Sequence, residues 1–262
     1  LERNPDGNLR YTKKGAHSRP RIWFHEESSG KAITTVPQKQ TAALPSVNIM
    51  EYTVMTDILT ANGACAGILA RTGDGSTLSI HARDTVMATG GIGGLYQHST
   101  NFPCLTGDAL TVARKHGVKL EHLDYVQIHP TSLYTEKPGR SFLISESARG
   151  EGAVLLNGKG ERFVNELLPR DAVSQAIEAE MEREGSRHVW LSFAPMPRET
   201  IREHFPHIYE TCLEEGYDIT REPIPVVPAQ HYFMGGVWVD LDSRTTMEHL
   251  YAVGETSCNG VH

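Results

Sequence analysis

Residues 129–171 read HPTSLYTEKPGRSFLISESARGEGAVLLNGKGERFVNELLPRD and hold most of the candidate site residues of this chain. The stretch mixes cationic, carboxylate and hydroxyl side chains, which suits holding an anionic substrate and moving a proton. Glu146 and Arg149 are three residues apart, so on a helical turn they share one face. Gly150 and Gly152 follow, and glycine lets the backbone approach another group closely. The stretch therefore predicts a binding and proton-transfer site.

Five ordered phrases resemble the substrate-binding region of the succinate dehydrogenase, fumarate reductase and L-aspartate oxidase flavoproteins. They are I-H-P-T at 128–131, S-E-S-A-R-G-E-G-A at 145–153, G-E-R-F-V-N-E at 160–166, P-R-D at 169–171 and H-Y-F-M-G-G-V at 231–237. One such phrase alone is a weak signal, whereas five in order at plausible spacing are a strong one. The resemblance covers nearly the whole chain.

The resemblance implies a mixed α/β (α+β) fold, namely part of an FAD-binding Rossmann-like domain with an inserted capping, or lid, domain. We expect residues 1–128 to form a partial FAD-binding domain and residues 129–228 to form the capping and substrate domain. Residues 229–262 then return to the FAD-binding domain and are truncated. The short helices expected between residues 172 and 216 favour a separate lid.

The same resemblance leads us to expect an internal fragment of a longer protein. The family begins with a strand–GxGxxG–helix unit, which does not appear here, and its members continue beyond the phrase G-V-H at 260–262. Glycine-loop amides at a helix N-terminus normally hold a flavin's pyrophosphate. We therefore expect this chain alone to bind FAD weakly or not at all and to be inactive by itself. A non-catalytic folded fragment is one alternative.

The composition is that of an ordinary globular protein. The 262 residues include 25 basic and 32 acidic side chains, and the net charge of −7 argues against a nucleic-acid surface. The four cysteines show no CxxC spacing, so neither a zinc site nor a redox dithiol is indicated, and scattered cysteines fit a reducing cytoplasm. His204 and His207 have a proline between them, and we expect no metal site. There is neither an apolar run of about 18 residues nor a signal peptide, which predicts a cytoplasmic protein without a membrane span.

Local patterns predict the secondary structure. Asp6-Gly7 is typical of a hairpin turn, and Asp108 is expected to cap a helix that Gly117 ends. The predicted strands and hairpins are 1–10, 47–58, 62–83, 84–89, 236–240 and 250–253. The predicted helices are 108–116, 171–184, one from Pro197 to Pro206, and 206–213. Residues 222–229 are expected to be a proline-rich connector.

Oxidation next to a carboxylate requires a hydride acceptor, and because no side chain accepts hydride, a cofactor is needed. A small diacid also needs cations and hydroxyls, and the residues of those kinds are His129, Thr131, Ser145, Glu146, Arg149 and His231. The resemblance implies that Arg170 is the proton shuttle, linked to a relay through Arg149 and Glu146. The alternative for Arg170 is a helix-start salt bridge with Asp171. For His231 the alternative is a core histidine.

The cofactor that the resemblance implies is FAD. The positions carried over to it are Met55, Thr89, Gly90, Gly91, Asp108, Gly254 and Glu255. Each has a plainer alternative: Met55 is sheet core, the glycines form a simple turn, and Asp108 is only a helix cap.

Within the family, the phrases at 225–240 and 243–262 resemble the L-aspartate oxidases. That activity converts L-aspartate to iminoaspartate in NAD biosynthesis, with the FAD reoxidised by oxygen or fumarate. The expected partner is thus a small dicarboxylate. The alternative is a fumarate reductase or a succinate dehydrogenase flavoprotein. One departure concerns Lys14, because L-aspartate oxidases usually carry a carboxylate there, three residues before the histidine that corresponds to His17.

Overall fold

The computed structural model describes residues 3–12, 19–23 and 29–261, in two compact units. Unit 1 comprises Leu1–Ile49, His129–Glu136 and Phe142–Pro228. Unit 2 comprises Met50–Ile128, Lys137–Ser141 and Ala229–His262. By contacts, the described residues up to 49 group with unit 1, and the predicted division into FAD-binding and capping domains stays a prediction.

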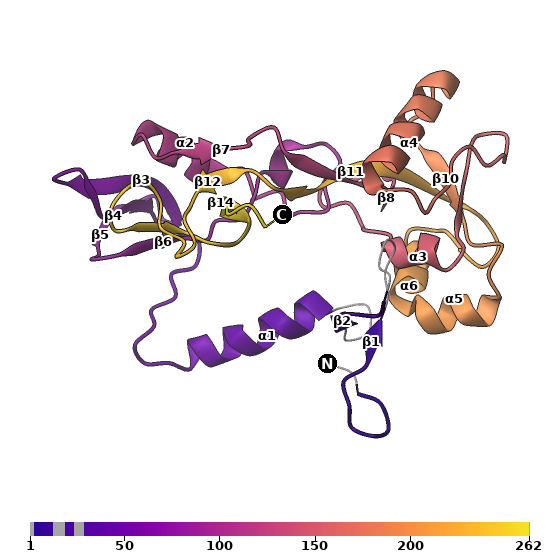
Figure 1. The fold of residues 1–262 in the computed structure, drawn as a ribbon, viewed down its shortest axis with the longest axis horizontal. Helices are drawn as coiled ribbons and strands as arrows, with labels where there is room; N and C mark the ends of the chain where they lie inside the picture. Colours follow the sequence, from indigo (N-terminus) through magenta and orange to yellow (C-terminus); the bar gives the residue numbers. More distant parts are fainter. Residues whose placement is uncertain (1–2, 13–18, 24–28, 262) are drawn as a thin grey trace. The chain divides into compact units, whose positions relative to one another are not determined.

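Unit 1 contains most of a four-stranded sheet in the order β8-β11-β10-β9, and residues 126–128 of β8 and 229–233 of β11 belong to unit 2. These strands are β8 (Val126–Leu133), β11 (Ile224–Phe233), β10 (Val189–Ser192) and β9 (Val154–Leu156). β10 runs antiparallel to both of its neighbours. In Figure 1, α4 (Arg170–Glu184) and the pair α5 (Arg198–His204) and α6 (Pro206–Glu214) lie on opposite sides of this sheet.

The proline-rich segment at 222–229, which we expected to be an extended connector, is extended, but most of it lies in strand β11 of the sheet. A proline removes a donor from the ladder but keeps its acceptor. The carbonyl of Pro225 accepts from the amide of Tyr134 at 2.9 Å. Ile224 and Val226 are fully buried, so the burial of this strand outweighs the missing N–H groups.

The helices of unit 1 follow their sequence signals. α4 ends at Gly185, which adopts φ 64°, a conformation that glycine takes without strain. α6 begins with Pro206, whose missing N–H is harmless in a first turn. Val173 and Ile177 of α4 join a core with residues of β9, β10, α5 and α6.

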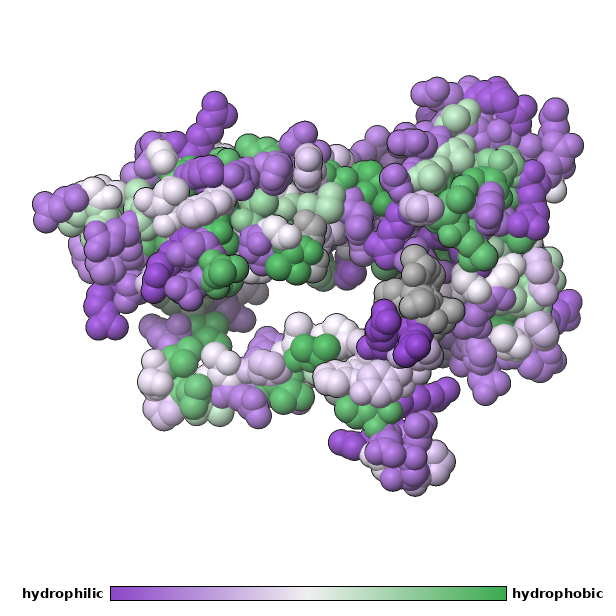
Figure 2. Space-filling view, viewed as in Figure 1, coloured by the Kyte–Doolittle hydropathy of each residue, from purple (hydrophilic) through white to green (hydrophobic). Residues whose placement is uncertain are grey.

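The N-terminal part of unit 1 contains the predicted hairpin, in which Arg3 and Leu9 form an antiparallel bridge. β1 (Tyr11–Thr12) and β2 (Ile22–Trp23) form a two-stranded sheet. α1 (Ser29–Ala42) has no buried residue, and Figure 2 shows green, hydrophobic side chains along it. Two sequence expectations in this region, for Lys14 and His17, lie outside the described residues.

Unit 2 contains three small sheets and one α-helix (Figure 1). The antiparallel sheet β3-β4-β5 consists of β3 (Val54–Ala61), β4 (Ala64–Arg71) and β5 (Thr77–His81). β6 (Thr85–Met87) runs parallel to β13 (Leu250–Ala252). β12 (Gly236–Trp238) lies between β7 (Leu120–Glu121), which is antiparallel to it, and β14 (Ser257–Cys258), which is parallel.

α2 (Asp108–Lys115) packs against β3, β7 and β12 through an apolar face. Asp57 of β3 fixes its C-terminal end, because it pairs with Lys115 and lies 2.6 Å from Nε2 of His116. The hydrogen bond from Lys115, followed by that from His116, lowers the pKa of Asp57 to about 2. A second hydrophobic core, in unit 2 alone, surrounds this helix.

Three local predictions for unit 2 need correction. The strand predicted at 47–58 begins only at Val54. The helix at 108–116 is confirmed, but Gly107 is its N-cap, with φ 70°, and Asp108 is its first residue. A left-handed cap favours glycine, which explains the difference. The short strand predicted at 84–89, which we expected to be buried throughout, has Val86 58% exposed and only Met87 buried.

Candidate active site

The predicted catalytic residues Glu146, Arg149 and Arg170 lie together in unit 1. Glu146 and Arg149 stand at opposite ends of the single-turn helix α3 (Glu146–Gly150), and Arg170 is the first residue of α4. Oε2 of Glu146 accepts from Nη2 of Arg170 at 2.8 Å and from its Nε at 3.3 Å. Oε1 lies 3.6 Å from Nη2 of Arg149. One carboxylate therefore serves two guanidinium groups, and the three side chains carry a formal charge of +1.

Arg149 is buried, with 2% of its side chain exposed. Its Nη1 donates to the carbonyl oxygen of Glu166 at 2.7 Å, while Nε and Nη2 make no hydrogen bond to the described residues. The 3.6 Å contact with Glu146 is an ion pair too long to be a hydrogen bond. Burial lowers the pKa of Arg149, and the charge of Glu146 opposes that shift. Two buried donors lacking a hydrogen-bond acceptor suit an anionic ligand.

Glu166, which the sequence interpretation did not single out, is the buried residue behind Arg149. Its Oε1 accepts from the amide of Leu155 at 2.9 Å and its Oε2 from Nη2 of Arg162 at 2.7 Å. Its backbone carbonyl is the one that holds Arg149. The G-E-R-F-V-N-E phrase was the available signal. It contains Glu161 and Glu166, and the sequence did not show which of the two is buried.

The predicted substrate-binding residues of unit 1 are buried or half-buried close to α3. His129 and Thr131 lie on β8 with 1% and 0% exposure, and the amide of Thr131 is 3.2 Å from Nδ1 of His129. The hydroxyl of Thr131 donates to the carbonyl of Ile144 at 3.2 Å. Ser145 caps α3 by accepting from the amide of Ser147. Both hydroxyl residues thus have structural tasks besides any ligand.

His231 lies in unit 2, within a polar group that the sequence interpretation missed. Its Nδ1 is 2.8 Å from Oγ1 of Thr100, and its carbonyl accepts from Nδ2 of Asn101 at 3.0 Å. Oγ1 of Thr100 also lies 3.3 Å from the carbonyl of Gln230. The run Ser99–Asn101 follows the glycines at 90–94, a position that could have suggested a role. The substrate-binding role predicted for His231 stays a prediction.

Two predicted cofactor phrases follow adjacent parallel strands in unit 2. Thr89, Gly90 and Gly91 come after β6, and Gly254 and Glu255 come after β13. The carboxyl ends of neighbouring parallel strands are the usual place for a nucleotide in open α/β sheets. The hydroxyl of Thr256 links the two phrases. Its Oγ1 lies 3.0 Å from Oγ1 of Thr89 and 3.1 Å from the carbonyl oxygen of Gly90.

The residues at these strand ends fit a bound nucleotide. Gly254, at φ 67°, has open space where a Cβ would stand, whereas a Cβ at Gly91 would collide with the carboxylate of Glu255. Oε1 of Glu255 accepts from the amide of Phe233 at 2.8 Å, yet burial raises its pKa. Because the carboxylate of Glu255 is partly shielded from water, it is suited to accept hydrogen bonds from the hydroxyl groups of a ligand.

The other two predicted cofactor residues do not take part in these contacts. Met55 packs against the core of unit 2, as its plainer alternative expected. Asp108 is exposed at the start of α2. Any role of these two residues toward FAD stays a prediction.

A family model described as an FAD binding domain matches residues 1–262. The chain belongs to the FAD-binding domain family. The mixed α/β flavoprotein fold and the FAD cofactor predicted from the sequence are thereby confirmed. No helix among the described residues is long and apolar enough to cross a membrane.

Relatives in this family include L-aspartate oxidases. That of Clostridium perfringens is 48% identical over 100% of this chain and 60% of its own length, and that of Clostridium acetobutylicum is 43% identical with the same coverage. The chain therefore spans about 60% of the length of these two relatives.

Similar solved structures come from the same family of flavoproteins. A quinol-fumarate reductase with menaquinol molecules superposes with a TM-score of 0.89 at 33% identity, covering 99% of this chain and 49% of that one. Mycobacterium smegmatis Sdh1 in complex with UQ1 gives 0.79 at 31% identity, covering 100% and 47%.

Proposed function

We propose that this chain is part of an L-aspartate oxidase, an FAD-dependent enzyme that converts L-aspartate to iminoaspartate at the start of NAD biosynthesis. The observation that carries the proposal is the carboxylate of Glu146 held between Arg149 and Arg170. The identity of 43–48% with L-aspartate oxidases over the whole chain supports this substrate over others in the family.

The proposed reaction removes a hydride from the α-carbon of L-aspartate and a proton from its amine. FAD, when bound, supplies the hydride acceptor. A protonated guanidinium cannot accept a proton, so Arg170 first passes a proton to Glu146, whose Oε2 lies 2.8 Å from its Nη2, and then takes the proton of the substrate.

The carboxylates of the substrate are proposed to bind His129, Thr131, Ser145 and His231. The local charge of +1 at Glu146, Arg149 and Arg170 attracts a dianion despite the net charge of −7. The buried Nε and Nη2 of Arg149 are the donors that would gain most from such a partner.

For the cofactor we propose contacts with Thr89, Gly90, Gly91, Gly254 and Glu255, and further contacts with Met55 and Asp108. Unit 2 is then the FAD-binding part of the chain, and residues 129–136 and 142–228 of unit 1 form the capping part. We further propose a cytoplasmic enzyme whose electron acceptor is oxygen or fumarate.

A fumarate reductase or succinate dehydrogenase flavoprotein is the second candidate, favoured by the TM-score of 0.89 to a fumarate reductase. The deciding experiment is steady-state oxidation of L-aspartate and of succinate by the whole protein, with oxygen and with fumarate as acceptors. We expect L-aspartate to give the higher kcat/KM. Faster oxidation of succinate would assign the protein to the second candidate.

A third candidate is a folded fragment without catalysis. Measuring the flavin absorbance of the purified chain alone distinguishes it. We expect little or no flavin on the chain by itself, and stoichiometric flavin on the whole protein. A whole protein that binds no flavin would exclude both enzymatic candidates.

A further inference from the structure

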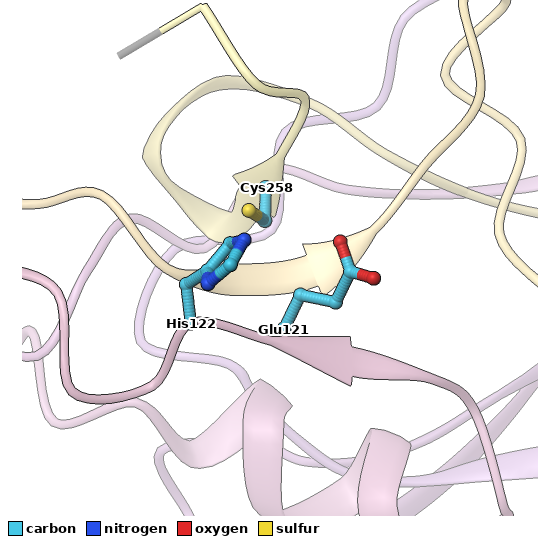
Figure 3. Close-up of side chains that lie close together, drawn as sticks. All are labelled: Glu121, His122 and Cys258. Atoms are coloured by element: carbon cyan, nitrogen blue, oxygen red, sulfur yellow. The ribbon is translucent and has the colours of Figure 1, made fainter.

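We propose that Glu121, His122 and Cys258 form a binding site for a borderline-soft divalent cation of the zinc class. The donor atoms of these three residues all lie within 4.8 Å of one another in unit 2. Figure 3 shows the imidazole of His122 and the sulfur of Cys258 meeting over strand β12, with the carboxylate of Glu121 alongside. Thiolate, imidazole and carboxylate together are a ligand set that zinc accepts.

The strand order explains how residues so far apart in sequence meet. β7 and β14 flank β12 on opposite sides, and the register sets Gly236 opposite Glu121. A Cβ at Gly235 would collide with the carbonyl oxygen of His122. Glycine at 235 thus lets the chain after β7 come close to β12, whereas a Cβ at Gly236 would collide with the carbonyl oxygen of Thr256, just before β14. Side chains from the two flanking strands can therefore meet across it.

His122 has the backbone strain that often accompanies a function. Its φ of 51° is left-handed, a conformation that is uncommon for residues other than glycine, and its ring stacks on Tyr125 with centroids 4.5 Å apart. The residue is exposed, so an ion from solvent can reach it, whereas Cys258 is a free cysteine with 6% exposure. An ion can therefore approach from solvent on the side of the imidazole, whereas the thiol lies on the buried side of the site.

Binding would require a small side-chain adjustment and the loss of one proton. Donor atoms around a tetrahedral zinc ion are roughly 3.5 Å apart, so these atoms, which lie within 4.8 Å of one another, must approach by at most about 1.3 Å. The thiol of Cys258 releases its proton to solvent when the metal–sulfur bond forms. Three protein ligands leave one position for water or another small donor.

Lys119 competes with the ion for Glu121. Its Nζ lies 2.6 Å from Oε1 of Glu121 and 5.0 Å from the ring centroid of Trp238. The ammonium group thus occupies part of the place that a cation would take. Removing this lysine should strengthen metal binding, the opposite of what is expected for a residue that supports a site.

The test uses the purified whole protein, stripped of metal with a chelator and titrated with Zn²⁺ by calorimetry and with Co²⁺ by difference absorbance. We expect one site per chain and a thiolate–cobalt charge-transfer band that Zn²⁺ abolishes. Cys258→Ser should remove the band, whereas Cys104→Ser, which changes an exposed cysteine elsewhere in unit 2, should keep it.

Two further variants keep the test interpretable. His122→Asn should weaken Zn²⁺ binding at least about tenfold while preserving the backbone, since asparagine tolerates left-handed φ. Lys119→Gln should bind Zn²⁺ more tightly than the unaltered protein. The proposal is overturned if no band forms, if Cys258→Ser retains it, or if His122→Asn binds as well as the parent. Flavin content, measured on each variant, reports separately on the proposed enzyme.

Discussion

At the scale of single residues, the carboxylate of Glu146 determines how Arg149 and Arg170 are held. Arg170 does form a salt bridge, as the plainer interpretation expected, but its partner is Glu146 on α3 and lies 24 positions away in sequence. Because Glu146 pairs with Arg170 and also with the buried Arg149, this arrangement fits a proton relay better than a salt bridge between Arg170 and Asp171 at the start of a helix would.

Substituting Arg170 tests the proposed proton transfer. Arg170→Gln removes the group that takes the proton but leaves the strand-end phrases of unit 2 intact. Turnover of L-aspartate by the whole protein should fall about 100- to 10,000-fold, with flavin content unchanged. Steady-state kinetics and flavin absorbance provide the two readouts. Near-normal turnover in Arg170→Gln would mean that this arginine is structural.

Thr100 is expected to orient the imidazole of His231. If its hydroxyl donates to the carbonyl of Gln230, 3.3 Å away, its oxygen must accept from Nδ1–H of His231, which fixes the tautomer. Thr100→Val should raise KM for L-aspartate several-fold more than it lowers kcat. Thr100→Ser should restore KM, because it keeps the hydroxyl. Equal effects of the valine and serine variants would contradict the assignment.

At the scale of elements, Asp57 joins strand β3 to the end of helix α2. Its folded pKa of about 2 lies below the unfolded value of about 3.9. A carboxylate with a lowered folded pKa adds stability above the unfolded pKa, and that stability is lost as the pH falls toward the folded value.

Asp57→Asn should therefore lower Tm at neutral pH, and the difference from the parent should shrink between about pH 4 and pH 2. Thermal unfolding followed by circular dichroism across this range measures the difference. Asp124→Asn, at an exposed position of the same unit, serves as the control and should change Tm little. A Tm difference for Asp57→Asn that is independent of pH would refute the role of ionisation.

At the scale of the whole molecule, each unit has a hydrophobic core of its own. Separate cores allow separate unfolding. Ile177, fully buried in unit 1, makes a direct test, since Ile177→Ala should destabilise that unit by about 2–5 kcal/mol.

Calorimetry of Ile177→Ala should accordingly show one transition moved to lower temperature and another unmoved. Val237→Ala, in the core of unit 2, should move the other transition. A single unfolding transition that both variants move to lower temperature would show that the two units unfold together.

The local setting of the three residues proposed to be catalytic was predictable, because it rests on short-range signals. Glu146 and Arg149 are joined by one helical turn, and Arg170 begins a helix that Pro169 and Gly185 bound. The resemblance of five ordered phrases supplied the roles. Thr100 and Gln230 escaped prediction, because their link to His231 depends on contacts between distant segments.

The sequence by itself determined the family, the local hairpins and helices, and the residue types of the candidate site, because these depend on side-chain chemistry and short-range spacing. Only the tertiary structure decided that Glu146 is shared by Arg149 and Arg170, that β11 is a strand despite Pro225, and that Cys258 meets His122. The physical reason is the same in each case. Burial and strand pairing act between segments far apart in the chain, and their energies exceed the local preferences that a sequence reveals.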